Sequence, residues 1–386
     1  MQRIRLAVGT TMFIDGLLYL AIFPLLPIFT EQYDLSKLDA AILLSAYQVT
    51  FVVIAIPAGW LAGRFGPRHV VITGLACFVL AAALFAVAPT FGVLIAARAL
   101  QGVAGGCGWS AAMSWLTENT ERERRSRTVG LMSGLSAAGA VGGPVIGALA
   151  AATSVLLAFS LVAVIGIGAL LLALLAPAGR TPAPGPSMVK TLRALLGHPT
   201  MITSMCFAFT VAICFATVDL LAVLELGSRG VSATTLGLIL STGALLGVGV
   251  GAISGRLGER IGSFGLCLLG AAGLVAITAL LAFPLPIWAI AVGIMLIGPL
   301  FPLLMTGIYP LVASASDDLS VPHGTANGVI NIFWTGATAI VPLAAAQIAD
   351  AYGDAAAYGT AAVVTVMLIA IAVFMRSRAR NLSLSH

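Results

Sequence analysis

The sequence predicts an all-α membrane protein whose helices cross the bilayer many times. Of its 386 residues, 60% are hydrophobic and only 9% are charged, and the mean hydropathy is +1.09. Soluble globular proteins contain about 45–50% apolar and about 25% charged residues. The apolar residues also gather in stretches of about 20, the length that an α-helix needs to span the hydrocarbon core. These observations exclude a soluble enzyme.

Twelve apolar stretches are long enough to span a bilayer by this measure. In the first half of the chain they lie at approximately 6–29, 40–62, 70–88, 91–114, 128–151 and 154–176. In the second half they lie at approximately 201–224, 233–254, 264–283, 287–312, 327–349 and 355–375. Because the number is even, both termini are expected on the same side.

Basic residues are distributed unevenly between the two sets of loops. The loops on the side of the termini hold sixteen of the nineteen: Arg3, Arg5, Arg64, Arg68, Arg122, Arg124, Arg125, Arg127, Arg180, Lys190, Arg193, Arg256, Arg260, Arg376, Arg378 and Arg380. The positive-inside rule therefore places both termini in the cytoplasm, in a multi-pass protein of the inner (plasma) membrane. No aromatic residues alternate with the basic ones, so the net charge of +5 does not indicate a nucleic-acid partner.

The longest break between apolar stretches runs from residue 177 to 200 and begins with several Pro and Gly residues. Such a start is typical of a linker, and the segment MVKTLRALL within it predicts a short interfacial helix. We therefore expect an N-terminal six-helix bundle over 1–176, a cytoplasmic linker over 177–200 and a C-terminal six-helix bundle over 201–386.

The two halves also share a short repeated pattern. Residues 59–66 read GWLAGRFG after the second stretch, and residues 255–262 read GRLGERIG after the eighth. The residues that recur 196 positions later are Gly59, Leu61, Arg64 and Gly66. Internal repetition at this scale is typical of secondary transporters, so the two bundles are expected to be pseudo-symmetric.

The fifth apolar stretch contains six glycines and one proline between residues 130 and 148. In a helix in water each interior Gly costs about 1 kcal/mol and Pro about 3 kcal/mol relative to Ala, but lipid offers the backbone no other partners and keeps it helical. Gly139, Gly143 and Gly147 are four apart and share one face, with Pro144 beside them. This face suits a helix that slides or rocks against a partner, and a static packing face of small residues is the alternative.

Three motifs give the chain a resemblance to a known family. Residues 59–68, GWLAGRFGPR, follow the loop signature G-x-L-a-D-r-x-G-r-k, except that Gly63 replaces the aspartate. Residues 98–102, RALQG, match the fourth-span signature R-x-x-q-G. Residues 130–148 match the fifth-span antiporter signature of glycines and a Gly-Pro pair, except that Ala148 replaces the last glycine. By these motifs the chain resembles the major facilitator superfamily, and within it the twelve-span drug:proton antiporter branch.

The resemblance implies the major facilitator fold, in which two six-helix bundles alternate between inward- and outward-open states. It implies conformational gating for the residues of the loop and fifth-span motifs: Gly59, Arg64, Gly66, Gly139, Gly143, Pro144, Gly147 and Glu259. In the family, the loop acid is thought to brace the loop against a helix N-terminus of the other half. Gly63 removes that acid from the first copy, whereas Glu259 keeps one in the second copy, near Thr128 in the expected symmetric contact.

Three ionisable residues fall clearly inside the predicted spans, namely Asp15, Arg98 and Asp219. Each costs about 2.5–3.5 kcal/mol to insert, so we expect them to face the bundle interior or a wet cavity. The resembled exporters, which include the vesicular monoamine transporters, carry acids at similar places in spans one and seven and the arginine in span four. Asp15 and Asp219 are therefore candidates for binding protons, a cationic substrate, or both in competition, and Arg98 for tuning a neighbouring acid or orienting Gln101. A structural pairing of Arg98 with an acid, without proton coupling, is the alternative.

Other polar and aromatic residues in the spans are candidates to line a central cavity. They are Tyr19, Tyr47, Gln48, Gln101, Tyr309, Asn331 and Trp334. Asn331 and Trp334 are three apart and share a helix face. Packing or anchoring at the membrane interface is the alternative role for each aromatic residue.

The sequence thus predicts a secondary exporter of small amphipathic or cationic compounds, driven by proton antiport. No phosphate-binding G-x-x-x-x-G-K-[ST] loop is present, so ATP hydrolysis is not expected. The five cysteines show no metal-ligand spacing, so we expect no bound metal. We also expect that the protein has no cofactor, is not an enzyme and is a monomer. The alternatives are a facilitator or proton symporter for a sugar or metabolite, and a membrane scaffold that transports nothing.

Overall fold

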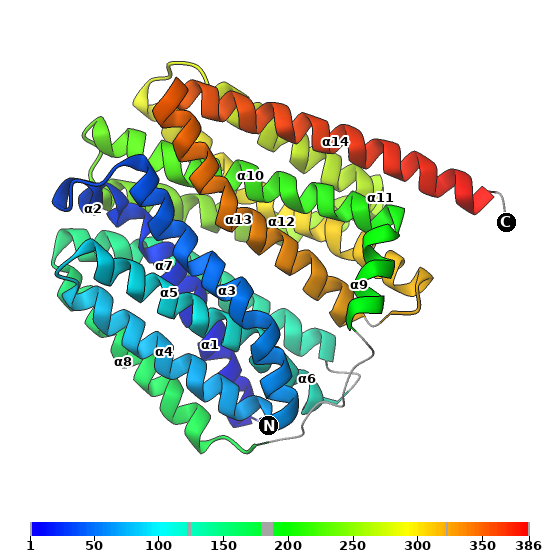
Figure 1. The fold of residues 1–386 in the computed structure, drawn as a ribbon, viewed down its shortest axis with the longest axis horizontal. Helices are drawn as coiled ribbons and strands as arrows, with labels where there is room; N and C mark the ends of the chain where they lie inside the picture. Colours follow the sequence, from blue (N-terminus) through cyan, green and yellow to red (C-terminus); the bar gives the residue numbers. More distant parts are fainter. Residues whose placement is uncertain (1, 122–124, 179–187, 322, 385–386) are drawn as a thin grey trace. The chain divides into compact units, whose positions relative to one another are not determined.

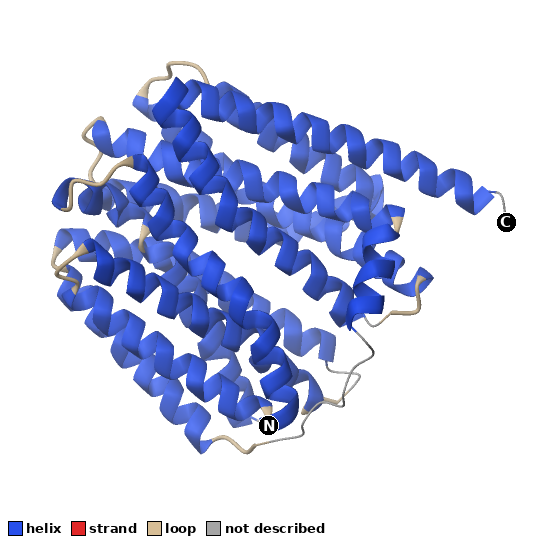
Figure 2. Ribbon diagram, in the orientation of Figure 1, coloured by secondary structure: helices blue, strands red, loops and turns tan. Residues whose placement is uncertain are grey.

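The computed structural model describes residues 2–121, 125–178, 188–321 and 323–384. Within these ranges the chain is almost entirely helical, and Figure 2 shows no strand among the described residues. The predicted all-α fold class is therefore confirmed.

The helices follow one another with short connections (Figure 1). The first part of the chain forms α1 (Gln2–Ala21), η1 (Phe23–Leu25), α2 (Leu26–Gln32), α3 (Lys37–Phe65), α4 (Pro67–Val87), α5 (Phe91–Cys107), η2 (Gly108–Ala112), α6 (Met113–Glu118), α7 (Arg125–Ala152) and α8 (Val155–Leu175). The rest forms α9 (Met188–Gly197), α10 (Pro199–Ser228), α11 (Ala233–Leu280), α12 (Ile287–Asp318), α13 (His323–Tyr352) and α14 (Asp354–Leu384). Helix α9 confirms the short helix expected from MVKTLRALL.

Eleven helices of the described chain are long and apolar enough to cross a membrane. One of them, α11, has 48 residues, which would extend about 72 Å if it were straight. Its backbone is non-helical at Gly262, which divides it into residues 233–261 and 263–280. Each part is long enough to span the hydrocarbon core, so α11 contains two of the predicted apolar stretches.

The repeated pattern has the same backbone conformation in both copies. Gly66 has φ 89° and ψ 141°, and it lies between α3 and α4. Gly262 has φ 75° and ψ 158° within α11. Positive φ with extended ψ is a region that is accessible to glycine and strained for other residues. The repeat at an offset of 196 therefore places two equivalent helix breaks.

The chain forms two compact units. Unit 1 comprises Met1–Pro184 and Val223–Ser241, and unit 2 comprises Gly185–Ala222 and Thr242–His386. Helices α10 and α11 each contribute residues to both units. The division of the chain at a linker over 177–200 stays a prediction.

Within unit 1, α7 packs along α1 through its glycines. A Cβ at Gly143 would lie 2.6 Å from the carbonyl oxygen of Leu17, and one at Gly139 or Gly147 would overlap the carbonyl of Phe13 or Ala21, respectively. Without side chains at these positions the two backbones approach closely, as in other small-residue helix contacts. The glycine face is thus covered by α1.

A different part of α7 contacts the first turns of α11. A Cβ at Gly237 would lie 2.5 Å from the carbonyl oxygen of Pro144 and 2.6 Å from the Cβ of Ala148. Nearby, Ser241 Oγ donates a hydrogen bond of 3.1 Å to the carbonyl oxygen of Val141. Residues 223–241 therefore complete unit 1 although they come from the second half of the chain.

Two arginines stabilise the C-terminal end of α8. Arg3 Nη1 donates to the carbonyl oxygen of Leu175 over 3.2 Å. Arg68 donates to the carbonyl oxygen of Ala173 through Nε over 3.2 Å and to that of Leu174 through Nη2. The last carbonyls of a helix lack partners within the helix, and cations there interact favourably with its dipole. The arginines therefore connect α1 and α4 to the end of α8.

The observed helices differ from the predicted apolar stretches mainly at their ends. The first stretch is not one regular helix: α1 ends at Ala21, and η1 and α2 follow it around Pro24 and Pro27. Helix α3 begins earlier than predicted because the Ser36 side chain caps it, with Asp39 completing a reciprocal capping box. Counting apolar residues misses such polar ends, since helices extend beyond the apolar core.

Candidate functional site

A buried carboxylate in unit 1, that of Asp15, is held by two hydrogen bonds from different helices. Asp15 lies on α1 and is only 6% exposed. Its Oδ1 accepts a bond of 2.9 Å from the Tyr47 hydroxyl on α3. Its Oδ2 accepts a bond of 2.6 Å from the indole Nε1 of Trp109 in η2. Both oxygens thus have donors, which compensates part of the cost of burying a charged group.

Arg98 on α5 lies in the same cluster and is fully buried, with 0% exposure. Its Nη1 donates to Gln101 Oε1 over 2.9 Å and to the carbonyl oxygen of Tyr19 over 3.4 Å. The guanidinium carbon lies 5.5 Å from the ring centroid of Tyr19 and 5.2 Å from that of Tyr47. Such cation–π contacts favour a cation that has lost its water. Its Nε and Nη2 are buried without a hydrogen-bond partner.

Arg98 forms no ion pair with Asp15 or with any other acid in the described part of the chain. The alternative in which Arg98 is paired directly with an acid is therefore not what this structure contains. The two charged groups are instead connected through the Tyr47 side chain, which donates to Asp15 and presents its ring to Arg98.

One further predicted residue, Gln48, completes this group of side chains. We call it the Asp15 cluster, and its members are Asp15, Tyr19, Tyr47, Gln48, Arg98, Gln101 and Trp109. Gln48 Nε2 donates to the Tyr19 hydroxyl over 2.9 Å, and the rings of Tyr19 and Tyr47 are 5.0 Å apart. Helix α1 supplies Asp15 and Tyr19, and α3 supplies Tyr47 and Gln48.

Glycines on α5 allow α3 to approach this cluster. A Cβ at Gly102 would overlap the Tyr47 carbonyl and the Thr50 side chain. A Cβ at Gly105 would lie 2.7 Å from the Tyr47 hydroxyl oxygen and 3.0 Å from Asp15 Oδ1. The glycine that ends the R-x-x-q-G motif, Gly102, is therefore explained by the close contact of α5 with α3.

Trp109 is the member of the cluster that the sequence did not identify. It follows Arg98 by eleven residues and Gly105 by four, spacings that put all three on about the same face of a regular helix. This shared helix face was the feature of the sequence from which Trp109 could have been predicted as a neighbour of Arg98. The segment Gly108–Ala112, however, is a π-helical turn, and nothing in the composition of GWSAA indicates one.

The cluster can hold a proton or a cation at one carboxylate. Asp15 is the acidic member, and in its ionised form it can accept from a donor or attract a positive group. Tyr19, Tyr47 and Trp109 provide flat faces of the kind that bind organic cations. A proton and a cation would then exclude each other at Asp15, because a protonated carboxyl carries no charge.

In unit 2, Asp219 lies on α10 and is half-buried. No side chain in the described part of the chain donates a hydrogen bond to it or pairs with it. Its helix also carries Phe215, one turn earlier, whose ring is 5.8 Å from that of Phe301 on α12. Phe301 in turn lies 5.9 Å from the Trp334 ring on α13.

The other predicted cavity residues of unit 2 do not form a cluster like that in unit 1. Tyr309 on α12 is 45% exposed, and Asn331 on α13 is exposed. Trp334 packs on Phe301, and its Nε1 is buried without a hydrogen-bond partner. Their role in lining a cavity stays a prediction.

The residues predicted to act in gating lie in different environments. Gly59 and Arg64 are exposed at the end of α3, where the Arg64 guanidinium carbon is 5.4 Å from the Trp60 ring and 5.5 Å from the Phe65 ring. Glu259 on α11 is exposed and has no hydrogen-bond or ion-pair partner among the described residues. Gating by these residues, by Gly66 and by the glycines of α7 stays a prediction.

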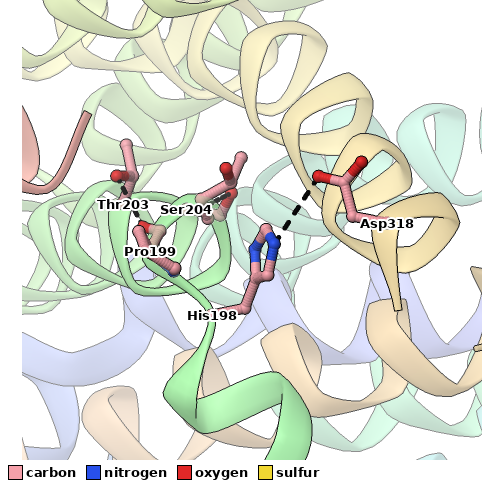
Figure 3. Close-up of polar contacts among 6 residues, drawn as sticks. His198, Pro199, Thr203, Ser204 and Asp318 are labelled. Atoms are coloured by element: carbon pink, nitrogen blue, oxygen red, sulfur yellow. Dashed lines mark hydrogen bonds and ion pairs between the residues drawn. The ribbon is translucent and has the colours of Figure 1, made fainter. Parts of the chain in front are cut away.

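The start of α10 contacts the end of α12 through a histidine and an acid in unit 2 (Figure 3). His198 Nε2 lies 3.5 Å from Asp318 Oδ2, a pair that is ionic only when the imidazole is protonated. Close by, the Thr203 hydroxyl donates to the Pro199 carbonyl oxygen over 2.9 Å. Across the described residues no three His, Cys, Asp or Glu side chains are arranged to hold a metal ion.

Comparison with known families and structures gives consistent matches. A family model described as the Major Facilitator Superfamily matches residues 8–342. A solved structure of a bacterial homologue of the human lysosomal transporter Spinster, in an inward-facing and unoccupied conformation, superposes with a TM-score of 0.78. The two share 12% sequence identity, and the match covers 97% of this chain and 96% of that chain, so the similarity is one of fold.

Relatives in sequence are more distant and match only part of their length. The MFS-type transporter ppzB of Metarhizium rileyi is 30% identical over 146 residues, which are 36% of this chain and 30% of the relative. The quinolone resistance protein NorA of Staphylococcus aureus is 25% identical over 153 residues, which are 40% of this chain and 39% of NorA. The matches thus span only 30% to 39% of the length of these relatives.

Proposed function

Since this chain belongs to the Major Facilitator Superfamily, we propose that it is a secondary exporter of small amphipathic or cationic compounds that exchanges them for protons. The observation that carries the proposal is the Asp15 carboxylate, which is buried among Tyr47, Trp109 and a nearby arginine. An ionisable group inside a membrane protein is expensive and usually serves transport. The name of NorA, a quinolone resistance protein, supports efflux of drug-like compounds.

We propose twelve spans that form two six-helix bundles. In this arrangement the two parts of α11, on either side of Gly262, are separate spans. Both termini and the segment 177–200 lie in the cytoplasm, and the membrane is the inner (plasma) membrane, as the distribution of basic residues indicates. The bundles alternate access to sites near the midplane, as in other transporters built from internal repeats.

Exchange follows from competition at a single carboxylate. A proton that binds Asp15 from the outside removes the charge that held the cationic substrate, and release of that proton to the cytoplasm restores it. Each pH unit of gradient supplies about 1.36 kcal/mol per proton, and the membrane potential adds about 2.3 kcal/mol per charge for each 100 mV. Asp219 is the candidate for a second such site in unit 2.

Transport in everted membrane vesicles with an imposed pH gradient tests this proposal. The probes are ethidium, a permanent cation, and a fluoroquinolone. We expect uptake when the lumen is acidic, release of luminal protons with uptake, and loss of the response to pH in Asp15→Asn, in Asp219→Asn or in both. Asp350→Asn is the control, because Asp350 is an exposed acid on α13 and its replacement should leave uptake unchanged.

Two outcomes would overturn the proposal. Substrate and protons moving in the same direction would make the protein a symporter for a metabolite. A wild-type response to pH in both Asp15→Asn and Asp219→Asn would remove these acids from coupling.

A further inference from the structure

The helix that carries Arg98 is interrupted by a π-helical turn directly beside the Asp15 cluster. Helix α5 ends at Cys107, the π turn covers Gly108–Ala112, and α6 begins at Met113. A π turn holds one more residue than an α-helical turn, is rare, and occurs frequently at functional sites. Here it places the Trp109 indole against Asp15.

Trp109 forms a stronger hydrogen bond to the ionised form of Asp15 than to its protonated form. The indole Nε1–H donates and cannot accept a hydrogen bond. The bond of 2.6 Å to Asp15 Oδ2 is charge-assisted while the carboxylate is ionised, and it weakens when a proton on either oxygen removes the charge. Tyr47 does not discriminate in this way, because its hydroxyl can donate to a carboxylate or accept from a carboxylic acid. Of the two partners of Asp15, Tyr47 can reverse its hydrogen bond when the acid is protonated, whereas the bond from Trp109 can only become weaker.

The π turn also contacts the helices around it. The Ser110 hydroxyl donates to the Ala55 carbonyl oxygen on α3 over 2.9 Å. A Cβ at Gly108 would lie 3.0 Å from Thr11 Cγ2 on α1, and one at Gly74 on α4 would lie 3.5 Å from the backbone nitrogen of Gly108. A change of register in this turn would therefore reach three helices of unit 1.

We propose that Trp109 is a positioning residue that couples the proton on Asp15 to the register of the π turn. With Asp15 ionised, the hydrogen bond from Trp109 holds the extra residue in the turn. When a proton binds Asp15, that bond loses its charge assistance and weakens, and among the described residues no other bond of the turn involves the carboxylate. Return to α-helical geometry then rotates α6 by about 100°, the angle of one residue. This inference rests on the proposed role of Asp15 in proton binding.

The ionisable and charged groups facing Asp15 are few. Tyr47 faces it from α3 and Arg98 from α5, and the ring of Tyr19 on α1 lies near both of these side chains. Helix α7, which packs along α1, carries its only ionisable residues, Arg125 and Arg127, at its N-terminal end. Helix α8, which also packs on α1, carries no ionisable residue, and Glu118 lies at the far end of α6. A pH-dependent change at Trp109 is therefore assigned to Asp15, because the tyrosines and the arginine titrate at much higher pH in water.

Tryptophan emission tests the coupling without any substrate. In a variant with phenylalanine at positions 60, 115, 288 and 334, Trp109 is the remaining tryptophan. We expect its emission to change with a single transition between pH 4 and 9, and Asp15→Asn added to this variant to abolish the transition. A pH-independent emission, or a transition that persists with Asp15→Asn, would overturn the inference.

Transport provides the second readout, through Trp109→Phe, which keeps a ring but removes the N–H. We expect the stimulation of ethidium uptake by a pH gradient to fall about tenfold, the factor for losing one hydrogen bond to a charged group, while exchange without a gradient persists. In an Asp15→Asn background, Trp109→Phe should have no further effect. The matched control is Trp115→Phe, because Trp115 is fully buried on α6 but its Nε1 has no partner.

The two proposals fail in different ways. If the wild type shows no proton-coupled uptake, the proposed function is wrong, and the emission titration still decides whether Asp15 controls Trp109. If the wild type is coupled and Trp109→Phe keeps the wild-type pH profile, the inference alone is wrong. Should Trp109→Phe fail to fold, the emission measurement, which retains Trp109, decides.

Discussion

Asp15 and Arg98 have opposite charges in one buried cluster, yet they are joined through a tyrosine rather than by an ion pair. A direct buried ion pair would hold both groups in one geometry, and breaking it would cost several kcal/mol. The cluster instead keeps Asp15 on neutral donors and leaves Arg98 Nε and Nη2 unpartnered. At the scale of the residue, this arrangement leaves the carboxylate free to exchange its partners.

Gly105 tests how closely the cluster must fit. Replacing it by alanine would put a Cβ 2.7 Å from the Tyr47 hydroxyl and 3.0 Å from Asp15 Oδ1, so we expect the Tyr47–Asp15 bond to be displaced and pH-driven uptake to fall about tenfold. Ethidium uptake in vesicles and thermal unfolding of the purified protein are the measurements. Gly168→Ala on α8 is the control, since its Cβ would meet nothing within 4 Å. Wild-type uptake in Gly105→Ala would show that this fit does not matter.

Sequence reasoning identified six of the seven residues in this cluster because polar groups within an apolar stretch are conspicuous. Trp109 was missed because an aromatic residue in a membrane span has many ordinary roles and because π turns have no sequence signature. Asp219, Tyr309, Asn331 and Trp334 were chosen by the same criterion, and within unit 2 no bond joins them. Residue type alone does not determine which side chains meet, since that depends on helix rotation.

At the scale of the element, the breaks at Gly66 and Gly262 are the clearest sign that the two halves share one design. Both glycines have positive φ and extended ψ, and they stand 196 residues apart. The first break separates α3 from α4, whereas the second lies within a helical run. The apolar stretches predicted where the helices lie, but their ends depend on caps, prolines and such glycines, which hydropathy does not measure.

Alanine at either glycine should be destabilising by a similar amount. A non-glycine residue in this backbone region costs about 1–3 kcal/mol, so we expect Gly66→Ala and Gly262→Ala to lower the free energy of unfolding by that amount. Denaturation in mixed micelles measures it. The matched controls are Gly59→Ala and Gly255→Ala, in the same two motifs, where a Cβ would meet nothing within 4 Å. Equal stability of all four variants would contradict this explanation of the repeat.

At the scale of the whole molecule, unit 1 is built from two separate parts of the chain, since Val223–Ser241 belongs with Met1–Pro184. Composition and repeats predict two halves that are continuous in sequence. They do not predict that residues 223–241 belong to unit 1, because that depends on contacts such as that of Gly237 with Pro144 and Ala148. The fold class followed from hydropathy, whereas the place of residues 223–241 in unit 1 depends on tertiary contacts that no sequence pattern contains.

Gly237 tests whether this contact matters for transport. Valine there would place its Cβ 2.5 Å from the Pro144 carbonyl oxygen, so we expect the start of α11 to separate from α7 and uptake to fall severalfold. Disulfide formation between cysteines introduced at Val141 and Ser241, which the Ser241 hydrogen bond brings together, should decrease in parallel. Gly249→Val on the same helix is the control, because a Cβ at that position would meet nothing within 4 Å. Undiminished cross-linking in Gly237→Val would refute this account.

The two-part construction of unit 1 affects how the protein is made. A ribosome delivers the first six apolar stretches to the membrane well before it has synthesised residues 223–241. Until then, α7 lacks its packing partner at Val141, Pro144 and Ala148. During that interval lipid or an insertion chaperone has to occupy this side of α7. Biogenesis of the first unit is therefore completed only when translation has passed its sequence midpoint.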